Sequence, residues 1–258
     1  MGSKSPPFKE RAPLKELTLT RLIPNMATVM ALCTGLTGIH FAMMNRFEMA
    51  VGAIIIAAIL DILDGRLARL LGVESDFGAE LDSLSDFVSF GVVPAVVIYM
   101  WSLHQWKGWG WGFCLFFVVC SGWRLARFNT YIRNPDTKVY RGFFMGVPAP
   151  MGAYLGLLPL IIGFALDVTT PLPQFIYGIS LAAAGLLMIS SIATFSTKTL
   201  KLTKRLFFPF LVFLGIMFMA LLNAPWDMLS LFGLGYLLSL PLSYYMFTKK
   251  HPNPKGDA

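Results

Sequence analysis

The sequence predicts an all-α integral membrane protein, and two observations support that fold class. Apolar residues make up 56% of the chain and charged residues only 14%, and the mean hydropathy is +0.65. A soluble domain carries about 25% charged residues, because it must cover its surface with polar groups. Long apolar runs also repeat along the whole chain, and a chain inside hydrocarbon must satisfy its backbone polar groups internally, which favours helices.

Eight transmembrane helices are expected, because most of the eight apolar runs approach the roughly 20 residues that cross a hydrocarbon core. These runs lie at about 24–45, 47–71, 79–101, 109–131, 147–166, 172–195, 206–223 and 226–247. The chain divides into a basic N-terminal segment at 1–23, a membrane domain at 24–223, and a last span with a basic tail at 224–258. Residues 8–22 fit an amphipathic helix on the membrane surface; a disordered basic tail is the alternative.

The positions of the basic residues predict the orientation. If the N-terminus is placed on one side of the membrane, every one of the 21 Lys and Arg residues except Arg46 and Lys107 falls on that side. Basic residues concentrate in the cytoplasmic segments of membrane proteins. Both termini are therefore expected in the cytoplasm, in a multi-pass protein of the cell (inner or plasma) membrane. The net charge of +7 then reflects topology, and no nucleic-acid partner is expected.

Half of the 14 acidic residues lie in one short stretch, between positions 61 and 86. Asp61 and Asp64 are three apart near the end of the second expected helix, and Asp82 and Asp86 are four apart near the start of the third. Each pair therefore shares a helix face. The short connection folds the two helices into a hairpin, so the four carboxylates can converge at the cytoplasmic interface. Ionisable groups in membrane spans are costly and mark functional sites.

Four neighbouring carboxylates repel one another unless cations lie among them. Hard oxygen ligands without Cys or His select Mg²⁺, Mn²⁺ or Ca²⁺. Two-metal sites are used for displacement at phosphorus. We therefore expect two divalent ions, Mg²⁺ or Mn²⁺, with Ca²⁺ as a bound, non-productive ion. The alternatives are a structural ion pair with Arg66 or Arg69 and a set of acids that face a water-filled vestibule.

Small residues and one cation accompany the acids. Gly65 and Ala68 follow the second carboxylate, and Gly78 lies one turn before the third. Residues without bulk let a ligand or a neighbouring helix approach the backbone. Arg69 can bind a phosphate, or it can extend to the interface as arginines at span ends commonly do.

The acidic hairpin resembles, position for position, the signature of the CDP-alcohol phosphotransferase family: Asp61-x2-Asp64-Gly65-x2-Ala68-Arg69-x8-Gly78-x3-Asp82-x3-Asp86. The resemblance implies a membrane enzyme that cleaves a CDP-linked donor, transfers a substituted phosphate to an alcohol and releases CMP. It implies that the four Asp bind two divalent metals, that Asp86 is also the general base, and that the protein is a homodimer. It further implies donor contacts from Asn25, Thr28, Asp61, Gly65, Ala68, Arg69, Ser75 and Gly78.

Three further segments, at 82–95, 124–129 and 144–150, resemble the membrane-embedded phosphatidylserine synthases of bacteria and archaea within that family. This likeness implies that CDP-diacylglycerol is the donor and L-serine the acceptor, with phosphatidylserine and CMP as products. In the third segment, Val147 and Ala149 depart from the Gly-Leu-Pro-Ser-Pro that those synthases more often show.

A zwitterionic acceptor such as serine needs a cation for its carboxylate and a hydrogen-bond acceptor for its ammonium. Arg124 and Arg127 lie three apart at the cytoplasmic end of the fourth span, with Asn129 close by. Arginine suits a planar carboxylate, and the amide oxygen of Asn129 can accept from the ammonium. Anchoring at the cytoplasmic face is the alternative role for each arginine.

Other functions remain open at this point. The same chemistry could serve choline, inositol or glycerol phosphate, although a phosphorylated acceptor calls for a stronger basic cluster and choline gives no role to Arg124 or Arg127. An ion channel or transporter could use the acids as a permeation site, but it does not explain the spacing of Gly65, Arg69 and Gly78. A non-catalytic scaffold has no need of four intact carboxylates.

Overall fold

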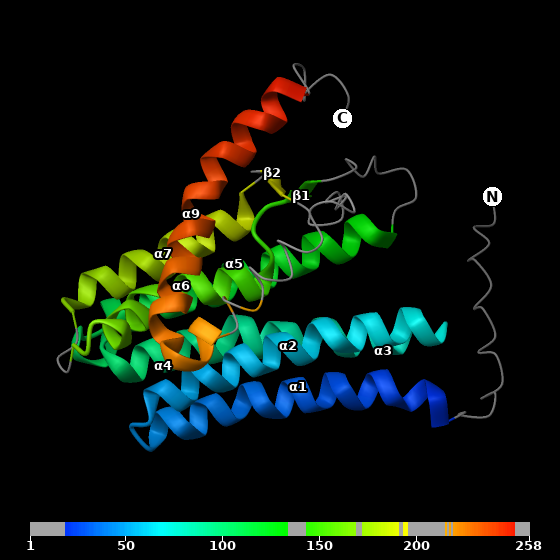
Figure 1. The fold of residues 1–258 in the computed structure, drawn as a ribbon, viewed down its shortest axis with the longest axis horizontal. Coiled ribbons are helices and arrows are strands. Elements are labelled where there is room, and N and C mark those ends of the chain that lie inside the picture. Colours follow the sequence, from blue (N-terminus) through cyan, green and yellow to red (C-terminus); the bar gives the residue numbers. More distant parts are fainter. Residues whose placement is uncertain are drawn as a thin grey trace, which may run out of the picture.

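A computed structural model of the chain describes residues 19–133, 143–168, 172–190, 193–195, 215, 217 and 219–250. Apart from two three-residue strands, the secondary structure of this part is helical, as the sequence predicts. Figure 1 shows the helices packed into one bundle, with the last helix running obliquely across it. Of the expected surface helix at 8–22, residues 8–18 lie outside the described residues, and the chain is already helical from Leu19.

Seven of the eight expected spans coincide with helical segments of the structure. Their bounds, with the third span divided into three parts, are α1 Leu19–Met43, α2 Phe47–Leu71, α3 Asp76–Asp86, η1 Phe87–Val92, α4 Val93–Trp101, α5 Trp109–Arg133, α6 Ala149–Ala165, α7 Gln174–Ile189 and α9 Pro225–Lys250. A single 3₁₀ turn, η2 Leu103–Gln105, precedes α5. The described residues of the seventh expected span, 215, 217 and 219–223, are also helical.

Three of these segments are long and apolar enough to cross a membrane: Leu22–Met43, Asp76–Trp101 and Trp109–Thr130. The helix α2 is as long as α1 at 25 residues, but it carries five charged residues, Glu48, Asp61, Asp64, Arg66 and Arg69. The helices α6 and α7 are apolar and have 17 and 16 residues. The described residues are therefore consistent with a membrane protein.

Two tight turns join α1, α2 and α3. Between α1 and α2 the chain reverses through Asn45, which has a φ of 57°; asparagine is among the few residues that adopt this region readily. The helix α2 ends at Gly72, which has a φ of 63°. The N–H of Gly72 donates to the carbonyl of Arg69 and that of Val73 to the carbonyl of Ala68, a Schellman ending that satisfies the last carbonyls.

The third span changes its helical geometry directly after Asp86. Residues Phe87–Val92 form a π-helix, and the N–H of Val93 donates to the carbonyl of Val88, five residues earlier. The next residue is Pro94, which lacks an N–H and whose ring clashes with the carbonyl four residues before it in a regular α-helix. The π-turn accommodates this proline, and such turns are frequent at functional sites.

The sixth expected span, 172–195, extends beyond the end of the helix in the structure. The helix α7 ends at Ile189, and Ala193–Phe195 forms the strand β2. It pairs antiparallel with β1, Phe143–Met145. The error has a physical cause: hydropathy counts these residues as part of an apolar run, whereas their backbone hydrogen bonds go to a strand about 50 residues earlier in the chain.

The core lies where α5, α6 and α7 pack together. Their fully buried side chains include Phe117, Leu157, Leu160, Leu181 and Met188. Small residues bring the helices close: a Cβ on Gly185 of α7 would lie 3.2 Å from the Sγ of Cys120 on α5. The helices α5 and α6 also contact η1, the segment that follows Asp86 directly.

A polar contact ties the end of α7 to α5. The guanidinium of Arg127 donates from Nη1 to the carbonyl of Ile189 at 2.8 Å and from Nη2 to that of Ser190 at 3.2 Å. The turn before α6 passes beside it at Gly146, which has a φ of 80°. A Cβ there would lie 2.7 Å from the carbonyl oxygen of Met188. Both the dihedral angle and the contact therefore require glycine.

Replacing that glycine tests the contact between the turn before α6 and the end of α7. Gly146→Ala is expected to lower the free energy of unfolding by about 1–3 kcal/mol, because alanine strains the backbone at positive φ and collides with a carbonyl. The measurement is the thermal unfolding midpoint of the detergent-solubilised protein.

The matched control is Gly52→Ala in α2, where an added Cβ meets nothing within 4 Å. Because alanine is favoured over glycine inside a helix, this variant is expected to unfold at the same temperature as the unchanged protein or a higher one. Equal midpoints for Gly146→Ala and the unchanged protein would contradict the tight turn.

Candidate active site

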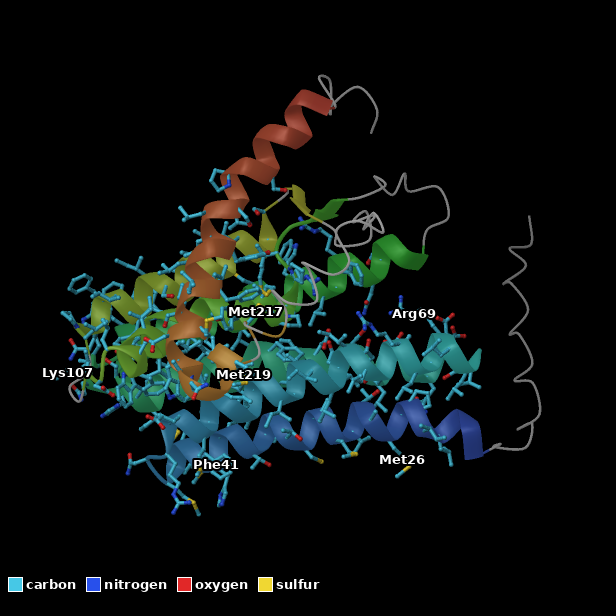
Figure 2. All side chains as sticks on the ribbon, in the orientation of Figure 1. Met26, Phe41, Arg69, Lys107, Met217 and Met219 are labelled. Atoms are coloured by element: carbon cyan, nitrogen blue, oxygen red, sulfur yellow. The ribbon has the colours of Figure 1, made fainter. Side chains whose placement is uncertain are left out.

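The hairpin of α2 and α3 gathers the four predicted carboxylates. One carboxylate oxygen from each of Asp61, Asp64 and Asp82 lies within 4.8 Å of the other two. The carboxyl of Asp86 lies close enough to that of Asp61 to interact with it electrostatically. The convergence that the spacing predicts is therefore present. Figure 2 shows Arg69 at this end of the bundle and Lys107 at the opposite end.

Three carboxylate oxygens in this cluster lack partners. Asp64 is only 3% exposed. Its Oδ2, together with Oδ1 of Asp82 and Oδ1 of Asp86, is buried and accepts no hydrogen bond. A buried polar atom without a partner is costly, more so when it is charged. These oxygens therefore suit a cation, and a site built only from carboxylates matches hard divalent ions.

Residues at the start of α3 meet the start of α1. Ser75 caps α3, and its Oγ accepts from the N–H of Gly78 at 3.1 Å. A Cβ on Gly78 would lie 3.0 Å from Oδ1 of Asn25. The three residues thus converge one turn before Asp82, and the missing side chain at position 78 leaves the room that Asn25 occupies.

Thr28 connects α1 to both helices of the acidic hairpin. It is 4% exposed. Its hydroxyl donates to the carbonyl of Pro24 at 3.1 Å and also lies beside the carboxyl of Asp64. Its own carbonyl accepts from the hydroxyl of Ser85 on α3 at 3.3 Å. One residue of α1 therefore contacts both helices of the acidic hairpin.

The last two turns of α2 carry the remaining residues that are predicted to contact the CDP-linked donor. Arg69 is exposed, and its Nε donates to the carbonyl of Gly65 at 2.8 Å. Its Nη2 lies 3.9 Å from where a Cβ on Gly65 would stand. The carbonyl of Ala68 takes part in the helix ending at Gly72. The backbone around Gly65 is exposed next to a cation, one residue from Asp64.

The predicted acceptor residues of α5 divide into two groups. The guanidinium of Arg124 interacts electrostatically with Asp86 and Asp61 and lies 5.2 Å from the ring centre of Phe128. Asn129 contacts α3, because its Nδ2 donates to Oγ of Ser83 at 3.0 Å. Arg127, in contrast, uses its guanidinium on the end of α7. The structure brings Arg124 and Asn129 to α3 and its acids and directs Arg127 elsewhere.

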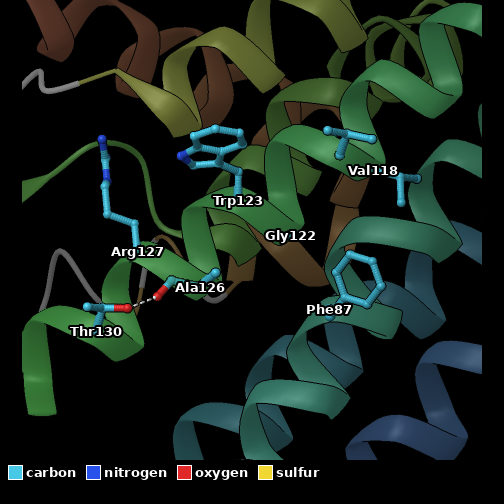
Figure 3. Close-up of a pocket in the computed structure, with 8 residues that line it drawn as sticks. Phe87, Val118, Gly122, Trp123, Ala126, Arg127 and Thr130 are labelled. Carbon is cyan, nitrogen blue, oxygen red and sulfur yellow. Dashed lines mark hydrogen bonds between the residues drawn. The ribbon is translucent and has the colours of Figure 1, made fainter.

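A groove of about 510 Å³ lies between η1 and α5. Figure 3 shows Phe87 on one side and Val118, Gly122 and Trp123 on the other. Arg127 and Thr130 close the end of the groove, and the hydroxyl of Thr130 donates to the carbonyl of its own helix at Ala126. None of the four Asp lines it, so this groove is distinct from the acidic cluster.

Comparison with known proteins identifies the family. Residues 21–240 match the CDP-alcohol phosphatidyltransferase family, which is most of the chain. The chain belongs to this family. The matched range contains the whole acidic hairpin and every predicted site residue from Asn25 to Asn129. Members of the family generally use divalent metal ions, which agrees with the unpartnered oxygens of the cluster.

Relatives within the family share most of their length with this chain. A protein of Mycobacterium leprae named CDP-diacylglycerol–serine O-phosphatidyltransferase is 38% identical over 242 residues, which cover 92% of this chain and 80% of the relative. A protein of the same name from Helicobacter pylori is 32% identical and covers 84% and 88%. One from Methanocaldococcus jannaschii is 38% identical and covers 66% and 72%.

Two contacts of this family member are not predicted by its sequence. Ser83 stands between two of the acids, and its contact with Asn129 joins positions 46 residues apart. In the sequence, this contact is indicated only by a hydroxyl directly after Asp82. The contact of Arg127 with α7 spans more than 60 residues. In the local sequence, the contact of Arg127 with α7 is indicated only by the turn residue Gly146, two positions before a proline.

Proposed function

We propose that this chain transfers the phosphatidyl group of CDP-diacylglycerol to the hydroxyl of L-serine and releases phosphatidylserine and CMP. The observation that carries the proposal is the cluster of four carboxylates, three of whose oxygens are buried and unpartnered. The family match and the relatives named for this reaction support it. They also support chemistry at phosphorus, which a permeation site does not require.

Two divalent ions, Mg²⁺ or Mn²⁺, would be held by Asp61, Asp64, Asp82 and Asp86, with Ca²⁺ as a non-productive substitute. The short distances between these carboxylates and their unpartnered oxygens support this assignment. When bound, such ions polarise phosphoryl oxygens and offset the charge that develops during displacement at phosphorus.

The donor nucleotide would be bound by the residues around the hairpin turn. Asn25, Ser75 and Gly78 converge at the start of α3, and Thr28 and Ala68 hold the adjoining helix ends. The exposed backbone at Gly65 lets a nucleotide approach closely. Arg69, whose guanidinium lies over that backbone, would bind a phosphate, for which its planar fork is suited.

Asp86 would act as the general base. It lies one turn further along the third span than Asp82, and one of its buried oxygens has no hydrogen-bond donor. The carboxylate takes the proton of the serine hydroxyl, and the freed oxygen attacks the phosphorus that bears diacylglycerol. The bond from that phosphorus to the bridging oxygen breaks, and CMP leaves with the electron pair. Arg124, which interacts electrostatically with Asp86, offsets part of the negative charge of the four acids.

The acceptor would lie between α3 and α5. Arg124 would bind the serine carboxylate, and Oδ1 of Asn129 would accept from the ammonium. Arg127 supports this arrangement, because its two hydrogen bonds hold the cytoplasmic half of α5 against α7. A carboxylate-binding cation next to the acids favours serine over choline as the acceptor.

We also propose eight membrane spans with both termini and the acidic cluster on the cytoplasmic side of the cell membrane, and a homodimer in that membrane. The separation of Arg69 and Lys107 to opposite ends of the bundle supports the orientation. The acyl chains of the donor would stay in the bilayer among the helices. The mass of the detergent-solubilised particle tests the dimer.

The orientation predicts which positions a membrane-impermeant thiol reagent reaches. In a background without the three native Cys, Glu74→Cys is expected to react only from the cytoplasmic side and Lys107→Cys only from the opposite side. Both positions are exposed and lie at opposite ends of the bundle. The measurement is labelling of intact cells against inverted membrane vesicles, and the reverse pattern would refute the orientation.

The acceptor is tested with the purified protein, CDP-diacylglycerol, and Mg²⁺ or Mn²⁺. Serine, choline, inositol and glycerol 3-phosphate are supplied separately, and CMP release is measured. Serine alone is expected to sustain turnover, because it alone offers both a carboxylate for Arg124 and an ammonium for Asn129. Release with choline and not with serine would overturn the assignment.

Two variants are expected to fail for different reasons. Asp61→Ala removes a ligand of the cluster and should weaken Mn²⁺ binding beyond the roughly 10–100-fold loss that outer partners of metal ligands produce. Asp86→Asn should retain more of its Mn²⁺ affinity, while kcat falls by about 10²–10⁴-fold through loss of the base. Mn²⁺ binding is followed by electron paramagnetic resonance and turnover by CMP release.

The control is Glu74→Gln, an exposed acid of the same hairpin outside the cluster, which is expected to change neither quantity. If Asp86→Asn with metal bound kept near-normal turnover, Asp86 would not be the base.

A further inference from the structure

A single hydroxyl joins the acidic helix to the predicted acceptor residue. Ser83 follows Asp82 directly on α3, and its Oγ accepts from Nδ2 of Asn129 on α5 at 3.0 Å. The same Oγ donates to the carbonyl of Ala79, one turn earlier, at 3.0 Å. Both residues of the pair are partly buried. A chain of two hydrogen bonds therefore runs from the amide of Asn129 into the backbone of α3.

The direction of these hydrogen bonds determines which end of the Asn129 amide, its oxygen or its NH₂ group, bonds to Ser83. A serine hydroxyl has one proton, and the carbonyl of Ala79 is its nearer acceptor, since Oδ1 of Asn129 lies at 3.4 Å. Once that proton is given to Ala79, the hydroxyl can only accept from Asn129, and so it binds the NH₂ end. The amide oxygen of Asn129 is left to accept from a ligand.

We propose that Ser83 is a positioning residue for the acceptor: it holds the amide of Asn129 with its oxygen, and not its NH₂ group, presented to the ammonium of serine. This inference rests on the proposed function. An unconstrained amide rotates between two orientations of similar shape, and one of them directs N–H groups at a cation. The neighbouring hydroxyl removes that second orientation and so favours an amino alcohol over an alcohol without an ammonium.

A simple packing role for Ser83 makes a different prediction. A hydroxyl that only joins α3 to α5 would, when removed, loosen the whole acceptor site and weaken every ligand alike. A hydroxyl that orients the amide affects only ligands that carry an ammonium. The two roles are separated by 3-hydroxypropionate, which is serine without the ammonium, and ethanolamine, which is serine without the carboxylate.

The experiment measures the KM for L-serine and the inhibition constants of these two compounds, with the full-length protein in detergent, CDP-diacylglycerol and Mn²⁺. Ser83→Ala is expected to raise the serine KM and the ethanolamine inhibition constant by about five- to tenfold, the effect of one hydrogen bond. The constant for 3-hydroxypropionate and the KM for CDP-diacylglycerol are expected to stay unchanged. Ser83→Thr, which keeps the hydroxyl, should restore the serine KM.

Asn129→Asp supplies a second and independent test. A carboxylate has two equivalent oxygens, so its orientation does not matter to an ammonium. In the Asn129→Asp background, Ser83→Ala is therefore expected to leave the serine KM unchanged. The matched control is Thr130→Ala, whose hydroxyl bonds only the carbonyl of Ala126 on its own helix among the described residues; it should change none of the constants.

The outcomes distinguish this inference from the proposed function. If the unchanged protein releases CMP with another alcohol and not with serine, the proposed function is wrong. If it uses serine, but Ser83→Ala leaves the serine KM unaltered or weakens all three ligands equally, only the positioning role is wrong. An equal effect of Ser83→Ala in the unchanged protein and in the Asn129→Asp background would also reject it.

Discussion

Repulsion among four carboxylates is the constraint around which this structure is arranged. Two pairs of acids from α2 and α3 face one another, with three buried oxygens that accept no hydrogen bond. Cations among the carboxylates relieve this repulsion, and the surrounding helices hold the acids together. Thr28 of α1 contacts both helices of the hairpin, and Arg124 of α5 contributes positive charge. The same unsatisfied charge is what suits the cluster to divalent ions and phosphates.

The chain reaches this geometry by local backbone devices. Gly72 ends α2 in a left-handed conformation, and Ser75 caps α3 three residues later. The turn between the helices is therefore short and well defined, and the carboxylates approach within a few ångströms. The π-turn that begins after Asp86 lets the third span continue past Pro94.

Two arginines three positions apart have separate tasks in this bundle. Arg124 faces the acids, whereas Arg127 donates to the terminal carbonyls of α7. A spacing of three puts both on one side of α5, yet the neighbouring elements differ along the helix. The exposed carbonyls of α7 attract the second guanidinium, since a helix end favours a cation. The rigid block of α5 and α7 in turn holds Asn129 against α3.

The sequence alone determined the helical membrane fold, the acidic hairpin and the convergence of Asp61, Asp64, Asp82 and Asp86. Helical periodicity and a short connection are local properties, and they place these residues on facing surfaces without further information. The tertiary structure decided the β1–β2 pair, the attachment of Arg127 to α7 and the hydrogen bond from Asn129 to Ser83. These contacts join residues about 50 to 60 positions apart. The periodicity of a helix predicts which side chains share a face, but it does not predict which distant residue a side chain contacts.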